Sequence, residues 1–329
     1  MSNPILTIGI PTYNRPQNIV KTVRTLLPQL NERVKLVVHD NCSDTPVADL
    51  FTDDEKKLFY IRRNNVNIGG DANIAGVIYH ADTKWVWDLG DDDYPLEDAI
   101  NTILKYIDKY PDTLMFNFNS YLERVTESFE ELVNLCKYRY VYANFVYISS
   151  GIYNRDKLAD YLFYYFKNLS AMVGQTIFVL KYLEKNDDIC RFVKRKIVYH
   201  SVDNFDNNQD EVNNNKIKEG VGWSRASFVR RSSLIFEEFA DKRNELNSTL
   251  FKGITLIYLR ALFEEKRPFK KNISLFFFIV HTVGLYNLIR YNSFVIGQFL
   301  AKAIFPDCMY QKMKNRAKKA IINSSYNEK

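Results

Sequence analysis

Cysteine, glycine and proline are scarce in this 329-residue sequence, and each shortage excludes a class of protein. The four cysteines are dispersed and form no CxxC pair. Neither a disulfide framework nor a structural zinc site is therefore expected, and a reducing compartment is favoured. Twelve glycines and nine prolines are too few for a collagen-like or repetitive, turn-rich architecture.

Long apolar runs and a strong charge excess are also missing. The N-terminus lacks the basic and apolar segments of a signal peptide, and the most apolar later stretch, 274–280, is soon interrupted by polar residues. The 45 basic and 39 acidic side chains give a modest net charge of +6, and no nucleic-acid motif accompanies it. We therefore expect no confident membrane-spanning helix and no nucleic acid partner.

Strands and helices are expected to alternate through residues 1–120. Short apolar, β-branched segments predict strands, and amphipathic segments between them predict helices. The strands are expected at 6–10, 34–39, 58–62, 84–89 and 114–118, and the helices at 18–27, 71–80 and 95–109. Pro11 is expected to end the first strand, Asp71 to cap the second helix and Pro95 to open the third. This alternation predicts an α/β fold with a mostly parallel sheet covered by helices on both faces.

The second half has a different pattern. Its expected elements are strands within 139–149, helices at 156–167 and 176–183, a strand at 196–199, an Asn- and Asp-rich loop at 203–219, and helices from Trp223 almost to the end.

Polar loops follow four of the expected strands, at 11–15, 40–44, 65–71 and 90–93. In a parallel sheet, ligands bind beyond the carboxyl ends of the strands, where such loops meet. The sequence therefore predicts a binding site at this edge of the sheet.

Individual residues in these loops have two interpretations. The consecutive carboxylates of Asp91, Asp92 and Asp93 repel one another and suit Mg²⁺ or Mn²⁺, or they form a solvated acidic turn. Asp40 contacts a base or ribose, or makes an Asx-turn. Arg15 pairs with a phosphate or lies exposed. The loop at 67–70 brings its backbone close to a ligand, or is an ordinary loop.

Four motifs stand in order along the first third of the chain: PTYNR at 11–15, VVHDNCSD at 37–44, NNVNIGGDAN at 64–73 and WVWDLGDDD at 85–93. Together they resemble the family 2 glycosyltransferases, which have the GT-A fold. The resemblance is strong over the first third and weak over the middle third. It implies a GT-A domain at 1–222, with a nucleotide-binding half at about 1–120 and an acceptor half at about 121–222, and a C-terminal helical region at 223–329.

The resemblance also implies an activity, which is the inverting, metal-dependent transfer of a sugar from a nucleotide sugar to an acceptor hydroxyl. UDP is the default nucleotide, and the acceptor is a glycan or lipid-linked glycan in bacterial surface polysaccharide biosynthesis, as in capsule or lipopolysaccharide. The cofactor is Mn²⁺ or Mg²⁺, with Asp92 as principal ligand and Asp93 assisting. The nucleotide-sugar contacts implied are Pro11, Thr12, Tyr13, Asn14, Arg15, Asp40, Asn41, Asn67, Gly69, Asn73, Asp91 and Arg225.

The sequence departs from the family pattern at two places. Gly90 stands where the commonest form has an aspartate, and Gly174-Gln175-Thr176 stands where many relatives have Gly-Glu-Asp with the Asp as general base. Each remaining candidate for the base is also read as a surface charge or a helix cap. These candidates are Asp156, Glu184, Asp187, Asp188 and Asp203. Arg225 closes over the diphosphate or starts a helix, and His200 approaches the metal or is structural.

The C-terminal sequence leaves three interfaces open. Residues 251–305 are rich in apolar and aromatic side chains, and 312–319 is a basic cluster. This combination suits an anionic membrane surface, the catalytic domain or a second subunit. The expected location is the cytoplasm, with peripheral contact to the inner face of the membrane.

Two other functions compete with glycosyl transfer. A nucleotidyltransferase would carry a glycine-rich basic signature near the first strand, and PTYNR is not one. A catalytically inactive nucleotide-binding or interaction protein of the same fold is kept open by the absent Gly-Glu-Asp motif.

Overall fold

The first half of the chain alternates strands and helices, as its hydrophobic pattern predicts, and the computed structural model describes residues 4–136, 139–199, 231, 234–239, 241 and 277. The elements of this half, with 3₁₀ helices written η, are β1 (Leu6–Thr12), α1 (Pro16–Leu26), η1 (Leu27–Gln29), β2 (Val34–Asp40), η2 (Val47–Leu50), α2 (Asp53–Lys56), β3 (Tyr60–Arg63), α3 (Gly70–His80), β4 (Trp85–Asp88), β5 (Tyr94–Pro95), α4 (Ala99–Lys109) and β6 (Met115–Asn117).

The second half mixes short strands with short helices. Its elements are β7 (Arg124–Thr126), α5 (Phe129–Leu135), α6 (Arg139–Phe145), η3 (Ile148–Ser150), β8 (Gly151–Asn154), α7 (Arg155–Leu158), η4 (Ala159–Tyr161), α8 (Leu162–Lys167), η5 (Leu169–Ala171), α9 (Gly174–Leu183), β9 (Cys190–Phe192), β10 (Val198–Tyr199) and α12 (Leu234–Glu238).

One eight-stranded sheet, in the order β3-β2-β1-β4-β8-β6-β9-β7, runs through both halves. β3, β2, β1 and β4 pair in parallel, and β6 pairs in parallel with β9. β8 is antiparallel to both β4 and β6, so β4 and β6 again point the same way. The mostly parallel sheet predicted from the sequence is confirmed, and the carboxyl ends of six strands share one edge.

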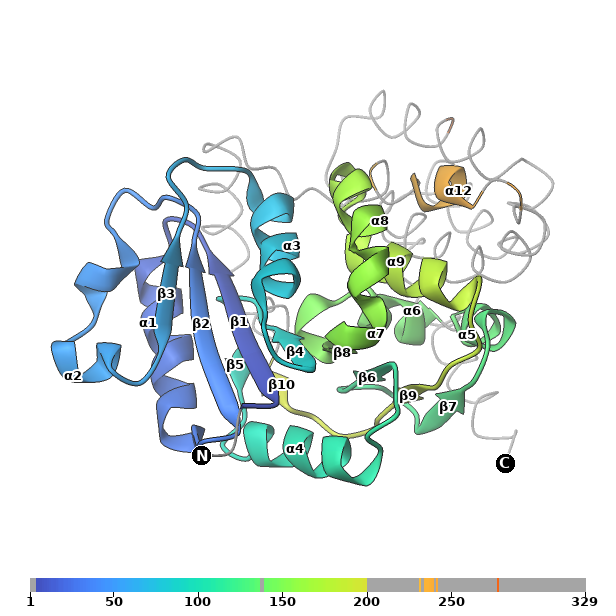
Figure 1. Cartoon of the computed structure of the whole chain (residues 1–329), viewed down its shortest axis with the longest axis horizontal. Coiled ribbons are helices and arrows are strands. Elements are labelled where there is room, and N and C mark those ends of the chain that lie inside the picture. The colour runs from blue at the N-terminus through green and yellow to red at the C-terminus, as the bar shows by residue number, and fades with distance from the viewer. Residues whose placement is uncertain are drawn as a thin grey trace, which may run out of the picture.

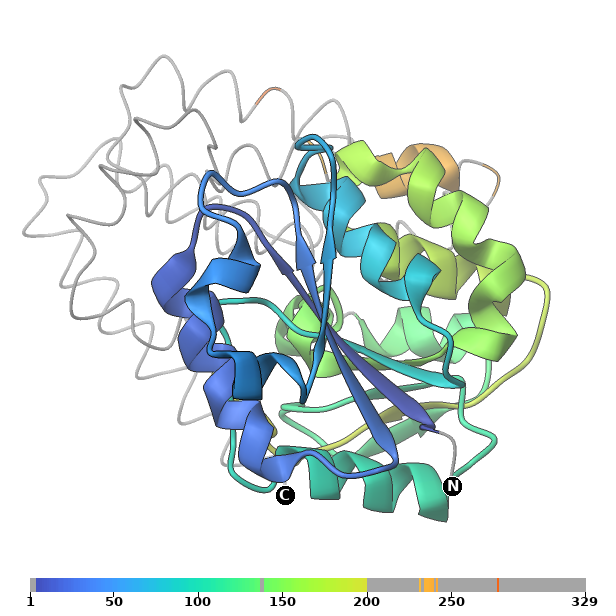
Figure 2. The ribbon, with the colours of Figure 1, turned by 60° about the vertical axis from the view of Figure 1, so that its left-hand side comes forward.

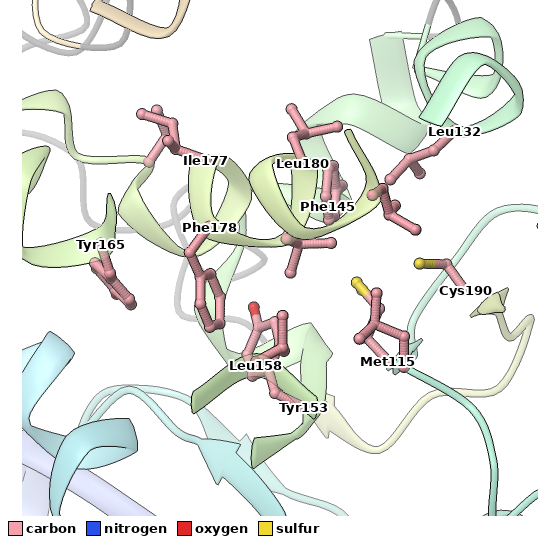
Figure 3. Close-up of a cluster of buried hydrophobic side chains, with 14 of the residues drawn as sticks. Met115, Leu132, Phe145, Tyr153, Leu158, Tyr165, Ile177, Phe178, Leu180 and Cys190 are labelled. Carbon is pink, nitrogen blue, oxygen red and sulfur yellow. The ribbon is translucent and has the colours of Figure 1, made fainter. Parts of the chain in front are cut away.

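Helices cover both faces of the sheet and enclose a core on each (Figure 1). Figure 2 shows α1 and α3 on opposite sides of the parallel strands. Along β4 the side chains alternate, so Trp85 and Trp87 join the core under α1 and α4, whereas Val86 joins the core under α3 and α9. In that second core Phe178 of α9 points toward Tyr153 of β8 (Figure 3), with ring centroids 5.6 Å apart.

Pro11 does not end the first strand, because β1 continues through it to Thr12. Pairing of β1 with β4 stops at Gly9, whose carbonyl accepts from the Leu89 N–H. Pro11 lies two residues further along β1, so its backbone faces the same side as that of Gly9, beyond the last β1–β4 pair. Its missing N–H therefore costs no ladder hydrogen bond.

Two predicted helix starts are wrong. Pro95 lies in β5, which pairs with β10 about a hundred residues later in the chain, and α4 begins at Ala99. Gly69, with φ of +88°, is the N-cap of α3, and Asp71 lies within its first turn. Pairing with a distant strand keeps Pro95 out of α4, and the positive φ of Gly69 sets the start of α3. Local propensity predicts neither feature.

Residues 139–149 are not strands as predicted, because α6 and η3 occupy most of this segment. Its aromatic and β-branched residues favour strands, but the buried side chains Val141, Tyr142 and Phe145 follow helical spacing. The helix expected at 156–167 is also broken into α7, η4 and α8, and β7, β8 and β9 were not predicted.

The second core extends to α12, far along the sequence. Ile235 and Phe239 are buried in it, and the Phe239 ring lies 5.9 Å from that of Phe129. The expected loop at 203–219, the basic cluster at 312–319 and all of 251–305 except Phe277 lie outside the described residues. Among the helices that are described, none is long and apolar enough to cross a membrane.

Candidate active site

The polar loops after β1, β2, β3 and β4 meet at the carboxyl edge of the sheet, as the sequence predicts. The Asn41 N–H donates to the Thr12 carbonyl at 2.9 Å, and the Asn64 N–H donates to the Asp40 carbonyl at 2.9 Å. These bonds continue the β1–β2 and β2–β3 ladders into the loops. The loops are therefore held by the sheet itself.

Asparagine side chains join the second and third loops. Asn41 donates to Asn67 at 2.8 Å and accepts from Asn64 at 3.0 Å. Asn73, nearly buried at the start of α3, donates to the His39 carbonyl at 2.9 Å and accepts from Asn64. The loop after β3 is thereby fixed on the end of β2, with Gly69 exposed in it.

The first loop is held against the second by Asn14. Its backbone is in the left-handed region, with φ of 52°, and its side chain exchanges hydrogen bonds with Asp44 at 2.8 and 3.0 Å. Its N–H donates to the Ser43 hydroxyl at 3.0 Å. Tyr13, beside it, remains 37% exposed on the edge of the site, whereas Pro11 is buried.

Asp40 faces the protein interior and is fully buried. It accepts from the N–H groups of Ser43 and Val47 and pairs with the Arg63 guanidinium. Burial acts to raise the pKa of Asp40, but these hydrogen bonds and the ion pair outweigh burial, and the pKa lies below its usual range. Asp40 therefore organises its own loop, in line with the turn interpretation.

The acidic turn after β4 presents its three carboxylates differently. Asp91 is buried, accepts from the Thr12 hydroxyl at 2.7 Å and pairs with Arg15 at 2.8 Å. Burial raises the pKa of Asp91, although Arg15 and Thr12 oppose the shift. Asp92 has 27% of its side chain exposed and pairs with Arg15 at 3.1 Å. Asp92 is thus the carboxylate of the turn that is most open to a ligand.

Asp93 is turned toward Ser149, a residue that the sequence did not single out. The Ser149 hydroxyl donates to Asp93 and accepts from the Gly90 N–H at 2.9 Å, and Tyr147 also donates to Asp93 at 3.3 Å. Ser149 comes from η3 in the second half of the chain. No sequence motif marked it, because its role depends on a contact across 56 residues.

Four of the suggested general bases lie away from this edge. Asp156 follows β8, whose last residue, Asn154, pairs with Trp85 at the start of β4. Asp188 precedes β9 and pairs with Lys157 at 2.8 Å. Glu184, paired with Lys181, and the exposed Asp187 lie beyond the C-terminal end of α9. The structure places these groups at the opposite edge, so it does not bring them to the site.

The start of α9 does lie near the acidic turn. Gln175 donates to the carbonyl of Val146 at 2.6 Å, just before the η3 segment that holds Ser149. Gly174-Gln175-Thr176, which the resemblance aligns with the family's Gly-Glu-Asp motif, thus lies near the acidic turn and carries no carboxylate. Asp203, His200 and Arg225 lie outside the described residues.

The residues present fit a divalent cation that a ligand helps to hold. Within the described ranges, no group of three or more His, Cys, Asp or Glu side chains forms a closed metal site. Mg²⁺ and Mn²⁺ commonly take one or two carboxylates and complete their shell with substrate phosphates and water. Asp92 supplies such an open carboxylate, whereas Asp93 supports the turn through Ser149.

Comparison with known sequences identifies the same family that the motifs resemble. The sequence model described as "Glycosyl transferase family 2" matches residues 7–177, just over half of the chain. A curated relative, the abequosyltransferase RfbV of Salmonella typhimurium, is 26% identical over 113 residues, which is 33% of this chain. The match spans only 34% of that relative.

Solved structures share the fold. TarS of S. aureus (residues 1–349) has a TM-score of 0.57 at 11% identity, covering 88% of this chain and 82% of that one. The same protein in complex with UDP-GlcNAc has a TM-score of 0.55 at 13% identity, with the same coverage. The mannosyltransferase PcManGT of Pyrobaculum calidifontis, in complex with GDP-Man and Mn²⁺, has a TM-score of 0.53 at 11% identity, covering 100% of this chain and 89% of that one.

Proposed function

Because the chain belongs to glycosyl transferase family 2, we propose that it moves a sugar from a nucleotide sugar to a hydroxyl group, with inversion and with a divalent cation. The observation that carries the proposal is the convergence of four polar loops on the acidic turn at the carboxyl edge of the sheet. A bound cation stabilises a departing diphosphate, and the exposed carboxylate of Asp92 could hold such a cation at this edge.

The nucleotide is proposed to lie across the loops after β1, β2 and β3. Tyr13 offers an exposed aromatic ring there, and Asn67, Gly69 and Asn73 border the same edge. UDP is the proposed nucleotide, supported by the UDP-GlcNAc complex of the structural neighbour TarS. PcManGT, crystallised with GDP-Man, makes GDP the main alternative to test.

The metal is proposed to be Mn²⁺ or Mg²⁺ at Asp92. Bound there, it stabilises the negative charge that develops on the departing diphosphate. Thr12 and Arg15 fix Asp91, and Ser149 and Tyr147 fix Asp93. These contacts hold Asp92 at the edge of the turn, so that its carboxylate is positioned before the ligand arrives.

The acceptor is proposed to be a glycan or lipid-linked glycan of a bacterial surface polysaccharide. The similarity to an abequosyltransferase supports sugar transfer, and the acceptor class rests on the resemblance of the motifs. Peripheral membrane association and a contact between subunits remain part of the proposal on the sequence alone, through the apolar segment at 251–305 and the basic cluster at 312–319.

The test is nucleoside diphosphate release from UDP-, GDP- and dTDP-sugars in the presence of Mn²⁺. We expect the wild type to release one nucleotide, and Asp92→Asn to lower the rate by about 100-fold or more. Asp82→Asn is the matched control, because Asp82 is an exposed carboxylate paired with Lys35 before β4. NMR of the glycosidic bond formed with an added sugar acceptor reports whether the anomeric configuration inverts.

Two outcomes would contradict the proposal. An equal rate in wild type and Asp92→Asn would remove the acidic turn from the reaction. Tight nucleotide binding without release or transfer from any donor would favour the inactive, nucleotide-binding alternative.

A further inference from the structure

Arg15 occupies the position between carboxylates that a metal ion would use. One guanidinium nitrogen, Nη1, lies 2.8 Å from Oδ1 of Asp91 and 3.1 Å from Oδ2 of Asp92. The Arg15 guanidinium thus supplies a positive charge to the acidic turn. Both oxygens lie on the turn that the proposed function assigns to the diphosphate.

A divalent cation and the Arg15 guanidinium compete for the carboxylate of Asp92. Mg²⁺ binds oxygens at about 2.0–2.1 Å, so a cation on Asp92 would lie close to the guanidinium. Like charges at such a distance repel strongly where water is partly excluded. In this resting arrangement Arg15 therefore weakens the affinity of the turn for a free cation.

The surroundings of Arg15 allow it to change partners. Asn14, beside it, is fixed by Ser43 and Asp44, so the backbone of the loop is anchored independently of the guanidinium. The Arg15 side chain itself is 34% exposed at the edge of the site. Guanidinium groups bind phosphate oxygens in a fork, which makes a diphosphate a strong competitor for Arg15.

We propose that Arg15 is the resting counterion of the acidic turn, and that it admits a divalent cation only together with a nucleoside diphosphate. The diphosphate draws the guanidinium to its own oxygens, releases Asp92 and supplies the remaining metal ligands. Donor and metal then bind as one unit. This inference rests on the proposed function and adds the order of binding.

The experiment measures Mn²⁺ binding to metal-stripped protein by the loss of the EPR signal of hydrated Mn²⁺, with and without UDP, GDP or dTDP. One of the three nucleotides is expected to be effective. With that nucleotide present, wild-type protein should bind Mn²⁺ at least tenfold more tightly than the nucleotide alone binds Mn²⁺ in buffer. Without nucleotide, we expect Arg15→Gln to bind Mn²⁺ at least tenfold more tightly than the wild type. Arg15→Lys keeps the charge and should stay within about threefold of the wild type.

Arg24→Gln is the matched control, because Arg24 lies on α1, the helix that follows Arg15 directly, and pairs with Glu55 on the surface. It should leave Mn²⁺ binding unchanged. If Arg15 were only a structural support of the turn, Arg15→Gln would weaken Mn²⁺ binding, and that result overturns the inference. Wild-type protein that binds Mn²⁺ equally well without nucleotide also overturns it, whether or not the variants fold.

The failure of the proposed function has a different signature. In that case no nucleotide binds the wild type with or without Mn²⁺ when binding is followed by calorimetry. A second outcome separates the two proposals: a nucleotide binds and raises the affinity of the wild type for Mn²⁺, but Arg15→Gln gains no affinity for Mn²⁺ alone. That result leaves the proposed function standing and overturns the role of Arg15.

Discussion

Gly90 shows how a single missing side chain shapes the acidic turn. A Cβ atom at this position would lie 3.1 Å from Oδ2 of Asp93 and 3.3 Å from the Ser149 hydroxyl. The space that an aspartate would need here is thus filled by the Asp93–Ser149 pair. The sequence marked Gly90 as a departure from the family pattern, but only the structure shows the contact that replaces the aspartate.

Ser149→Ala is expected to lower the free energy of unfolding by about 1–3 kcal/mol, since it leaves the Gly90 N–H and an Asp93 oxygen without this buried partner. Thr176→Val is the comparison, because Thr176 is equally buried and its hydroxyl has no hydrogen-bond partner among the described residues. That variant should be close to neutral. Urea unfolding of the two proteins measures the difference, and equal losses would refute the role of Ser149.

At the scale of the elements, β2 and α3 enclose a buried histidine. His39 of β2 stacks on His80 of α3 with ring centroids 6.1 Å apart. Burial, followed by the positive charges of His80 and Arg62, lowers the pKa of His39 to about 3. Folded His39 therefore stays neutral at a pH where an unfolded histidine takes up a proton.

This difference predicts a loss of stability in acid. The unfolded state binds the extra proton below about pH 6.5, so the contribution of His39 is present at pH 7 and is lost as the pH falls toward 3. Between pH 7 and pH 5 the loss is about 1–2 kcal/mol. Urea unfolding at both pH values should show a smaller loss in His39→Gln, whereas the exposed His80→Gln should keep most of it. An unchanged pH dependence in His39→Gln would disprove the assignment.

The sequence predicted elements where local pattern and tertiary environment agree. β1, β2 and β4 have apolar strands ended by polar loops, and their arrangement and the loops' convergence follow from general rules of parallel sheets. α6 was mistaken for strands because aromatic residues at helical spacing carry strand propensity. At the candidate site, the sequence predicted which loops converge but not the contacts between their side chains. The bonds of Arg15, Asp93 and Ser149 join distant segments, and no local pattern encodes them.

At the scale of the whole molecule, the second core joins segments from residue 75 to residue 239. The predicted boundary at 222/223 therefore separates Ile235 and Phe239 from the core in which they are buried. Glu238 adds a polar contact to the same surface by pairing with Lys167 at 2.8 Å. We infer that at least 234–239 stabilises the second core directly.

Phe239→Ala tests this continuity. Removing a fully buried phenylalanine side chain should cost about 3–5 kcal/mol of unfolding free energy. Phe163→Ala, at a position 67% exposed on α8, should cost about 0.5 kcal/mol or less. Both are measured by chemical denaturation. A Phe239→Ala protein as stable as the wild type would show that this segment does not support the core.

The central claim is a nucleotide–metal site at the acidic turn, and thermal stability with nucleoside diphosphates tests it most directly. A ligand that binds only the folded state must raise its apparent stability, by about 2.7 kcal/mol at a hundred times its dissociation constant. We predict that one of UDP, GDP and dTDP raises the melting temperature only with Mn²⁺. The shift should vanish in Asp92→Asn and persist in Asp82→Asn. No shift with any nucleotide at millimolar concentration, or a full shift in Asp92→Asn, would contradict the account.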